Sequence, residues 1–208
     1  MPGIELRPAT ADDIPPLARM LSRAFQDDPV QRWMCPDDAR RRRMNQALFM
    51  FLLSRVYLPG WLVYTTSDLG GVAPWAPPGQ WQVPMRKQVG LGPMMFRSCG
   101  RRLLRVLQGF HAMEARHKQR SEDHYYLHGF GVDPSLQGKG YGSSLLAAMA
   151  CRCDQEGMGA YLEASSSRSA ALYYRHGFEQ VDAVDLPDSG PTIHLMWRKP
   201  RASGSVSL

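Results

Sequence analysis

The residues best suited to chemistry form a glycine-rich segment, Gln137-Gly138-Lys139-Gly140-Tyr141-Gly142. Apolar residues recur at helical spacing directly after it, at Leu145, Leu146, Met149, Ala150 and Cys153. Glycines ahead of a helix let the backbone approach a ligand closely, and the first amides of a helix have no partner within it. The segment therefore predicts a phosphate or pyrophosphate site at the start of a helix that ends near Gly157 and Gly159.

The spacing of these glycines excludes two familiar nucleotide-binding motifs. The dinucleotide motif G-x-G-x-x-G requires a third glycine where this chain has Ser143, and the P-loop pattern G-x-x-x-x-G-K-[ST] is absent from the sequence. The remaining pattern is Q-x-x-G-x-G, at Gln137, Gly140 and Gly142.

Two strands and a second helix are predicted around this segment. Tyr125 to Val132 is rich in β-branched and aromatic residues and predicts a strand that stops at Asp133-Pro134. Tyr161 to Ser165 predicts another strand. A helix should follow over Ser166 to His176, with a serine cap at its start and Gly177 at its end.

The Q-x-x-G-x-G pattern, after a strand ending in V-x-P at Val132, resembles the acetyl-coenzyme A pyrophosphate loop of the GCN5-related N-acetyltransferases (GNAT). The later elements resemble the second half of that family's core, with L-E-x-S at Leu162 to Ser165 and Y-x-x-x-G-F at Tyr173 to Phe178. The resemblance implies an α/β (α+β) fold, in which helices flank a mixed, mostly antiparallel twisted sheet. Its central strands are expected to splay at the acetyl-coenzyme A site.

The resemblance also implies acetyl-coenzyme A as co-substrate and no metal. The diphosphate is expected on the amides of Gly138 to Gly142, and a backbone amide near Val132 is expected to stabilise the oxyanion. Lys139 has a second interpretation as a solvated loop residue. The expected cofactor-binding residues are Phe130, Gly131, Val132, Gln137, Gly138, Lys139, Gly140, Tyr141, Gly142, Ser143, Ser169 and Tyr173.

Acetyl transfer to an amine requires a proton for the leaving thiolate and a neutral amine. Tyr173 stands at the family's position for the acid, and a tyrosine, with a reference pKa of about 10, keeps its proton at neutral pH. The base is open between Glu163 and His128, with Glu122 and Asp123 as further candidates acting through water. His128 has a second interpretation as a satisfied, half-buried histidine.

Three residues are expected near the acceptor, each with a structural alternative. Asp27 and Asp28 bind a substrate cation or cap the next short helix. Trp75 lies on a strand expected to face the acceptor, or it belongs to the core.

Peripheral features resemble the sub-group that includes puromycin N-acetyltransferase: A-F-x-D-x-P at residues 24–29, the Trp75 strand followed by prolines, and the end at residues 197–200. Ser169 departs from this sub-group, whose members usually carry asparagine there. The sub-group implies acetylation of a primary amine on a small molecule, with antibiotic or aminonucleoside-like amines as candidates and a resistance role suggested. Direct attack in a ternary complex is expected. The alternatives are acetylation of protein lysines or N-termini, an inactive coenzyme A-binding regulatory module, and a basic nucleic-acid-binding protein.

Length and composition fit one domain over residues 1–200, with a polar tail over residues 201–208 that we expect to be disordered. No run reaches the ~20 apolar residues needed to cross a bilayer, and no signal-peptide pattern opens the chain. We therefore expect a cytoplasmic monomer or homodimer without membrane contact. The formal charge of +6 is explained by attraction of coenzyme A phosphates, so nucleic acid is a disfavoured partner.

Two basic segments have alternative interpretations. Arg40 to Arg43 opens a predicted helix and forms a solvated face or attracts anionic ligands. Arg101 to Lys118 predicts an amphipathic helix that packs on its own sheet or lies on a membrane or nucleic acid. The apolar face of this second helix is expected at Leu103, Leu104, Leu107, Phe110 and Met113.

Overall fold

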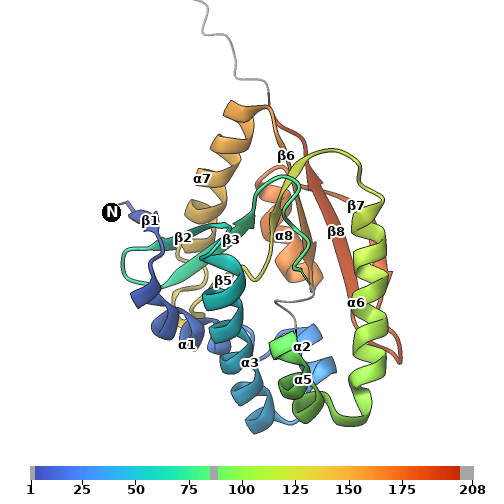
Figure 1. Cartoon of the computed structure of the whole chain (residues 1–208). Coiled ribbons are helices and arrows are strands. Elements are labelled where there is room, and N and C mark those ends of the chain that lie inside the picture. The colour runs from blue at the N-terminus through green and yellow to red at the C-terminus, as the bar shows by residue number, and fades with distance from the viewer. Residues whose placement is uncertain (1–2, 85–88, 202–208) are drawn as a thin grey trace, which may run out of the picture.

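Eight strands form one mixed sheet in the computed structural model, which describes residues 3–84 and 89–201 (Figure 1). The strand order is β1-β2-β3-β4-β6-β8-β7, and the short β5 pairs with β3. Strands β4 and β6 run parallel, whereas the other neighbouring pairs are antiparallel. The strands are β1 (Leu6–Pro8), β2 (Leu62–Thr66), β3 (Gly71–Ala76), β4 (His124–Leu127), β5 (Gly131–Val132), β6 (Gly159–Ala164), β7 (Glu179–Asp185) and β8 (Thr192–Arg198).

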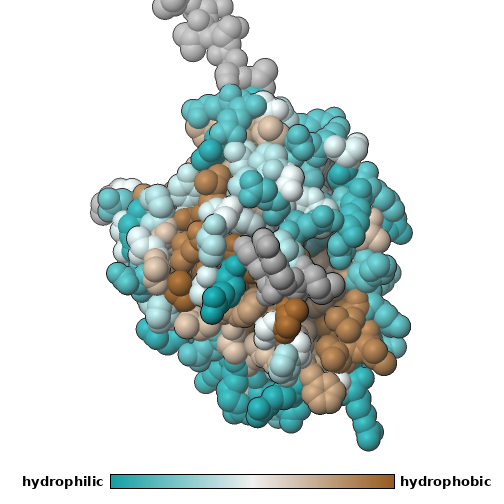
Figure 2. Space-filling view, viewed as in Figure 1, coloured by the Kyte–Doolittle hydropathy of each residue, from teal (hydrophilic) through white to brown (hydrophobic). Residues whose placement is uncertain are grey.

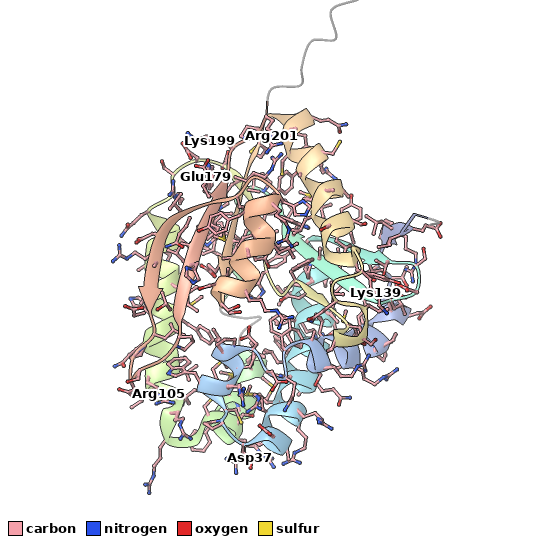
Figure 3. All side chains as sticks on the ribbon, turned by 180° about the vertical axis from the view of Figure 1, so that it is seen from behind. Asp37, Arg105, Lys139, Glu179, Lys199 and Arg201 are labelled. Carbon is pink, nitrogen blue, oxygen red and sulfur yellow. The ribbon has the colours of Figure 1, made fainter. Side chains whose placement is uncertain are left out.

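Helices cover both faces of this sheet, which confirms the predicted fold class (Figures 1 and 3). One face carries α7 (Tyr141–Glu156) and α8 (Ser167–Arg175), and the other carries α1 (Ile14–Ala24), α3 (Asp38–Leu52) and α6 (Leu103–Lys118). The shorter elements are α2 (Pro29–Met34), α5 (Gly92–Cys99), a π-helical turn (Leu53–Tyr57) and 3-10 turns at Ala11–Asp13, Val89–Leu91, Gly100–Arg102 and Pro134–Leu136. No helix in residues 3–84 and 89–201 is both long and apolar enough to cross a bilayer.

The two faces of the sheet differ in chemistry because successive side chains on a strand point to opposite sides. On the α7 face, Leu127 of β4 and Leu162 of β6 lie in an apolar core. On the α6 face the same strands present Tyr126, Tyr161 and Glu163. Titratable groups from the two central strands therefore gather on the face opposite α7.

The central strands separate at one point. Pairing of β4 with β6 ends at Leu127 and Leu162, after which β6 stays beside β8 as far as Ala164. The chain turns at Gly129, whose φ is 73°, and returns to β3 as β5. The single strand predicted over Tyr125 to Val132 is thus interrupted, because Gly129 adopts a left-handed conformation that breaks the ladder.

The ends of α7 and α8 confirm the predicted helix signals. Gly140 precedes α7 with φ 91°, and Gly157 follows it with φ 64°. Ser166 caps α8 by accepting a hydrogen bond from the Ser169 amide at 3.2 Å, and Gly177 ends that segment with φ 82°.

One arginine of the basic run on α3 is fully buried, so the solvated-face interpretation is wrong for it. Arg41 is 1% exposed and donates to the carbonyls of Gln26, Cys35 and Pro36 at 2.7 to 2.9 Å. Its guanidinium also pairs with Asp38. These bonds hold the segment between α1 and α3, which includes α2.

The predicted apolar face of α6 is only partly buried. Leu104 and Leu107 are 73% and 53% exposed, whereas Val106, Gly109 and His117 are buried against the protein. The prediction failed because small Gly109 allows close approach: a Cβ there would lie 3.0 Å from Leu186 and from Trp33.

The polar tail lies almost wholly outside the described residues. Arg201 is its one described residue, and its amide donates to Asp154 Oδ1 at 2.7 Å. Residues 202–208 are not described.

Replacing Arg41 by alanine should lower the free energy of unfolding by about 3 kcal/mol, because three carbonyls lose their buried donor and a cavity remains. Urea unfolding followed by circular dichroism measures this change. The matched control is Arg42→Ala, one residue along on the exposed side of α3, which should stay within about 0.5 kcal/mol of the parent. Equal effects of the two substitutions would contradict the structural role of Arg41.

Candidate active site

The glycine-rich loop places an exposed backbone ahead of α7. Gly138 and Gly140 have φ of 77° and 91°, and no heavy atom lies within 4 Å of a Cβ built at Gly138. Within the described part of the chain, no side chain caps the start of α7, and the first turn of this helix contains no acidic residue. The first amides of this 16-residue helix therefore face outward with the positive end of the helix dipole, which suits a phosphate group.

Two side chains of this loop anchor it to the sheet. Gln137 Nε2 donates to the Val132 carbonyl at 3.2 Å, and the Tyr141 hydroxyl donates to Asp68 Oδ2 at 2.6 Å. Lys139 is exposed beside the start of α7, where Figure 3 labels it. Gln137 and Tyr141 thus fix the loop through their side chains, and the backbone amides stay available.

The pairing of β5 with β3 fixes the direction of the Val132 amide. The next amide, that of Asp133, donates to the Gly70 carbonyl at 2.8 Å. Because successive amides of an extended strand point in opposite directions, the Val132 N–H faces away from β3 and toward the gap beside β6. This is the orientation that an oxyanion-stabilising amide needs.

Tyr173 and Phe130 meet between α7 and α8. Their ring centroids are 6.1 Å apart, and the Phe130 ring also lies 3.2 Å from a Cβ built at Gly142. Tyr173 is 7% exposed, and burial, with a smaller contribution from the nearby Asp28 carboxylate, raises its pKa far above 10. Tyr173 therefore carries its proton throughout the physiological range.

The Asp27-Asp28 pair divides into two roles. Asp28 Oδ1 accepts from the amides of Val30 and Gln31 and caps α2, so the capping alternative is confirmed for it. Its other oxygen accepts from the Ser165 hydroxyl just after β6. Burial raises the Asp28 pKa above its usual value. Asp27 is 83% exposed and lies 4.0 Å from Arg32, so it does not join Asp28 in one site.

Glu163 is a half-buried carboxyl close to the point where the strands separate. It lies one residue beyond the last pair of the β4–β6 ladder and accepts a hydrogen bond from the Tyr126 hydroxyl at 2.9 Å. Burial raises its pKa to about 7, although the Tyr126 bond acts in the opposite direction. Glu163 therefore exchanges a proton near neutral pH, as a general base must.

His128 forms a neutral pair with Tyr57. Its Nδ1 lies 2.5 Å from the Tyr57 hydroxyl, and burial lowers its pKa to about 4. Trp61 stacks on Tyr57 with centroids 4.9 Å apart and meets the His128 ring edge-on at 6.0 Å. The structure therefore places His128 within an aromatic group that also includes Tyr126.

The remaining residues predicted for the site lie in the core, in a helix cap or turn, or on the surface. Trp75 is 1% exposed in the core beneath α7, so its side chain does not line the α6 face with Glu163. The Ser169 hydroxyl belongs to the α8 cap, where it accepts from the Ser166 amide and donates to the Ser166 carbonyl. Glu122 and Asp123 are exposed before β4, and Ser143 lies half-buried in the first turn of α7.

Sequence reasoning missed the partners of these groups. Tyr57, Trp61 and Tyr126 surround the two base candidates, and Ser165 binds Asp28. Tyr126 had one usable signal, because it shares a strand face with His128 at a spacing of two. Tyr57 and Trp61 carried none, since they lie about 70 residues away in the chain.

Comparisons with known proteins agree with this geometry. The model of the acetyltransferase (GNAT) family matches residues 100–178, which include the glycine-rich loop, Glu163 and Tyr173. An uncharacterized N-acetyltransferase of Schizosaccharomyces pombe is 28% identical over 94% of this chain and 83% of its own length. The family match, the relative and the solved structures together support membership of the GNAT superfamily of acetyltransferases. The family uses acetyl-coenzyme A as acetyl donor.

Solved structures share this fold over nearly the whole chain. A Corynebacterium glutamicum protein described as histone acetyltransferase HPA2 and related acetyltransferase is 25% identical, with TM-score 0.69 over 96% of this chain and 98% of that one. A polyamine N-acetyltransferase of Drosophila melanogaster is 16% identical, with TM-score 0.58 over 93% of this chain and 98% of its own.

Replacing Glu163 by glutamine should change how stability depends on pH. Between pH 4.5 and 7 the unfolded carboxyl ionises while the folded one keeps its proton, so the stability contributed by the parent's neutral carboxyl is lost as pH rises. The free energy of unfolding of the parent minus that of Glu163→Gln should therefore fall by about 3 kcal/mol from pH 4 to pH 8. Urea unfolding across this range measures it. The exposed control Glu179→Gln should show no comparable trend, and a flat difference for Glu163→Gln would contradict the raised pKa.

Proposed function

We propose that this chain transfers the acetyl group of acetyl-coenzyme A to a primary amine of a small molecule, by direct attack in a ternary complex. The observation that carries the proposal is Glu163, a half-buried carboxyl with a pKa of about 7 beside the gap between β5 and β6. A base with this pKa is half ionised near pH 7, so it accepts a proton from an ammonium group without needing an alkaline medium.

The residues around the glycine-rich loop fit the donor. The amides from Gly138 to Gly142 and the start of α7 would hold the diphosphate, and exposed Lys139 lies close enough to add a positive charge. Phe130 and Gly131 border the gap along which the donor's thioester end would lie. When bound, the donor supplies an activated acetyl carbonyl.

Three groups of the chain then divide the work of the reaction. The Val132 amide would stabilise negative charge on the acetyl oxygen. Glu163 would take the proton of the amine through the oxygen that does not bind Tyr126, directly or through water. Tyr173 would donate to the departing sulfur, and among the described residues no hydrogen bond engages its hydroxyl.

The acceptor would enter from the α6 face of the sheet. Tyr57, Trp61, Tyr126 and His128 form a group of rings beside Glu163, and aromatic faces attract both apolar groups and cations. Proteins with this fold include a polyamine N-acetyltransferase and an arylalkylamine N-acetyltransferase, which supports a small amine as acceptor. Antibiotic and aminonucleoside-like amines belong to the same proposal through the puromycin N-acetyltransferase resemblance.

A peptide acceptor is the second candidate, since the Corynebacterium glutamicum structure is described as a histone acetyltransferase and related acetyltransferase. We also propose that residues 1–200 act as one domain, because β1 near the start and β8 near the end belong to one sheet.

Replacing Tyr173 by phenylalanine should lower turnover at least tenfold with little change in coenzyme A affinity, because the ring packing stays and the donated proton is lost. Thiol release measures turnover, and calorimetry measures coenzyme A binding. The matched control is Tyr174→Phe, since Tyr174 is adjacent on α8 but 50% exposed. Unchanged turnover in Tyr173→Phe would remove this residue from the mechanism.

The proposed activity is tested by thiol release from acetyl-coenzyme A against a panel of amines: puromycin, aminoglycosides, polyamines, arylalkylamines, amino acids and a lysine peptide. We expect release with one class of small amine. Release with the lysine peptide alone would replace the small-amine proposal by the peptide one. Failure to bind coenzyme A at all would contradict the assignment of the glycine-rich loop.

A further inference from the structure

Five large apolar side chains stand exposed where α5 meets α6. Leu104, Phe96 and Leu107 are 73%, 65% and 53% exposed. With Val89 and Phe110 they make up what we call the α5–α6 patch. Figure 2 shows apolar surface gathered at the lower right of the molecule, over α5 and the first turns of α6. Contiguous exposed apolar surface on a folded protein marks an interaction site.

The exposure of this patch is imposed by the opposite side of α6. Gly109 lies where a Cβ would be 3.0 Å from Leu186 and from Trp33, and His117 is buried with its ring stacked on Trp81 at 3.8 Å. Arg105 donates to the Trp33 carbonyl at 3.0 Å. Turning α6 to bury Leu104 would break these contacts, so the leucines remain outside.

The part of the sequence that includes the patch is rich in basic residues and lacks acidic ones. Residues 69–113 contain six Lys and Arg residues and no Asp or Glu. The whole chain has 25 basic and 19 acidic residues, so the other residues hold 19 of each and cancel. Four of these six cations, Arg97, Arg101, Arg102 and Arg105, lie on α5, the following 3-10 turn and α6, and the other two lie outside the described residues.

Three arginines of this segment are free to meet an external anion. Arg97, Arg101 and Arg102 are exposed, and none of the ion pairs found within residues 3–84 and 89–201 involves them. Arg105, by contrast, is 3.5 Å from Asp188 and serves the fold. The patch thus combines exposed aliphatic and aromatic side chains with unpaired guanidinium groups.

We propose that the α5–α6 patch binds an anionic lipid surface. Its apolar side chains would enter the boundary between headgroups and acyl chains, while Arg97, Arg101 and Arg102 contact anionic headgroups, as at the surface of an interfacial helix. A second copy of the chain fits less well, because two patches of the same charge repel each other. The sequence alone led us to expect no membrane contact, and the exposed leucines change that expectation.

This orientation leaves the donor side of the candidate active site accessible. The patch includes α6 on one face of the sheet, whereas the glycine-rich loop precedes α7 on the other. Figure 3 shows Lys139 and Arg105 on opposite sides of the molecule. A protein resting on the patch would therefore still exchange a soluble donor at α7, whereas the proposed acceptor would approach on the α6 face that carries the patch.

The test is co-sedimentation of the full chain with vesicles of phosphatidylcholine containing 30% phosphatidylserine, compared with pure phosphatidylcholine. We expect binding to the anionic vesicles that weakens as salt is raised. Leu104→Ser with Leu107→Ser should reduce the partition constant at least tenfold, because the inserting groups are lost. Replacing Arg97, Arg101 and Arg102 by glutamine should reduce it on the order of a hundredfold, since each arginine contributes roughly fivefold.

Two control variants test whether binding depends on where the basic and apolar side chains lie or only on how many the protein has. Arg40, Arg42 and Arg43 replaced by glutamine remove the same charge from the exposed side of α3, and Val181→Ser removes an exposed apolar group from β7. Both should leave the partition constant within about threefold of the parent. Absence of binding by the parent would overturn the proposal, as would equal losses in the α3 triple variant. A dimer in light scattering that Leu104→Ser with Leu107→Ser dissociates would assign the patch to a second copy instead.

Discussion

The separation of β5 from β6 is the constraint on which the rest of the site depends. A sheet resists such a gap, because each unpaired amide and carbonyl inside it lacks a partner. Here the gap is held open from both sides, since β5 is paired with β3 and β6 is paired with β8. Asp28 ties the start of α2 to Ser165 at the end of β6. The helices that follow the two strands, α7 and α8, then begin on either side of the same gap.

Short-range features of this arrangement were predictable from the sequence. The glycine-rich loop, the serine cap of α8 and the glycine after each helix depend on residues a few positions apart. Their physical causes are equally local, namely left-handed backbone conformations and unpaired helix-end amides. The resemblance of two such motifs, in order, was enough to predict the fold class and the helix that carries Tyr173.

Contacts between distant segments were not predictable in this way. Tyr57 reaches His128 across 71 positions, and Asp28 reaches Ser165 across 137. One sequence interpretation placed Arg41 on a solvated face, and another packed the apolar face with Leu104 on the sheet, but Arg41 is buried and Leu104 is exposed. In each case the outcome depends on which face of a helix packs against its neighbour. A small residue such as Gly109 sets that face because it allows close approach, and the spacing of apolar residues does not show this.

The close approach of Tyr57 to Gly129 also restricts the order in which this sequence can evolve. A Cβ at position 129 would lie 2.6 Å from the Tyr57 hydroxyl oxygen and 3.4 Å from Cζ. Loss of the hydroxyl first removes its hydrogen bond with His128 and the clash, and a later alanine at φ 73° then adds backbone strain of roughly 1 to 2 kcal/mol. Loss of the glycine first meets both the clash and the strain. The two substitutions are therefore coupled: replacement of Gly129 is better tolerated after the Tyr57 hydroxyl is lost than before it.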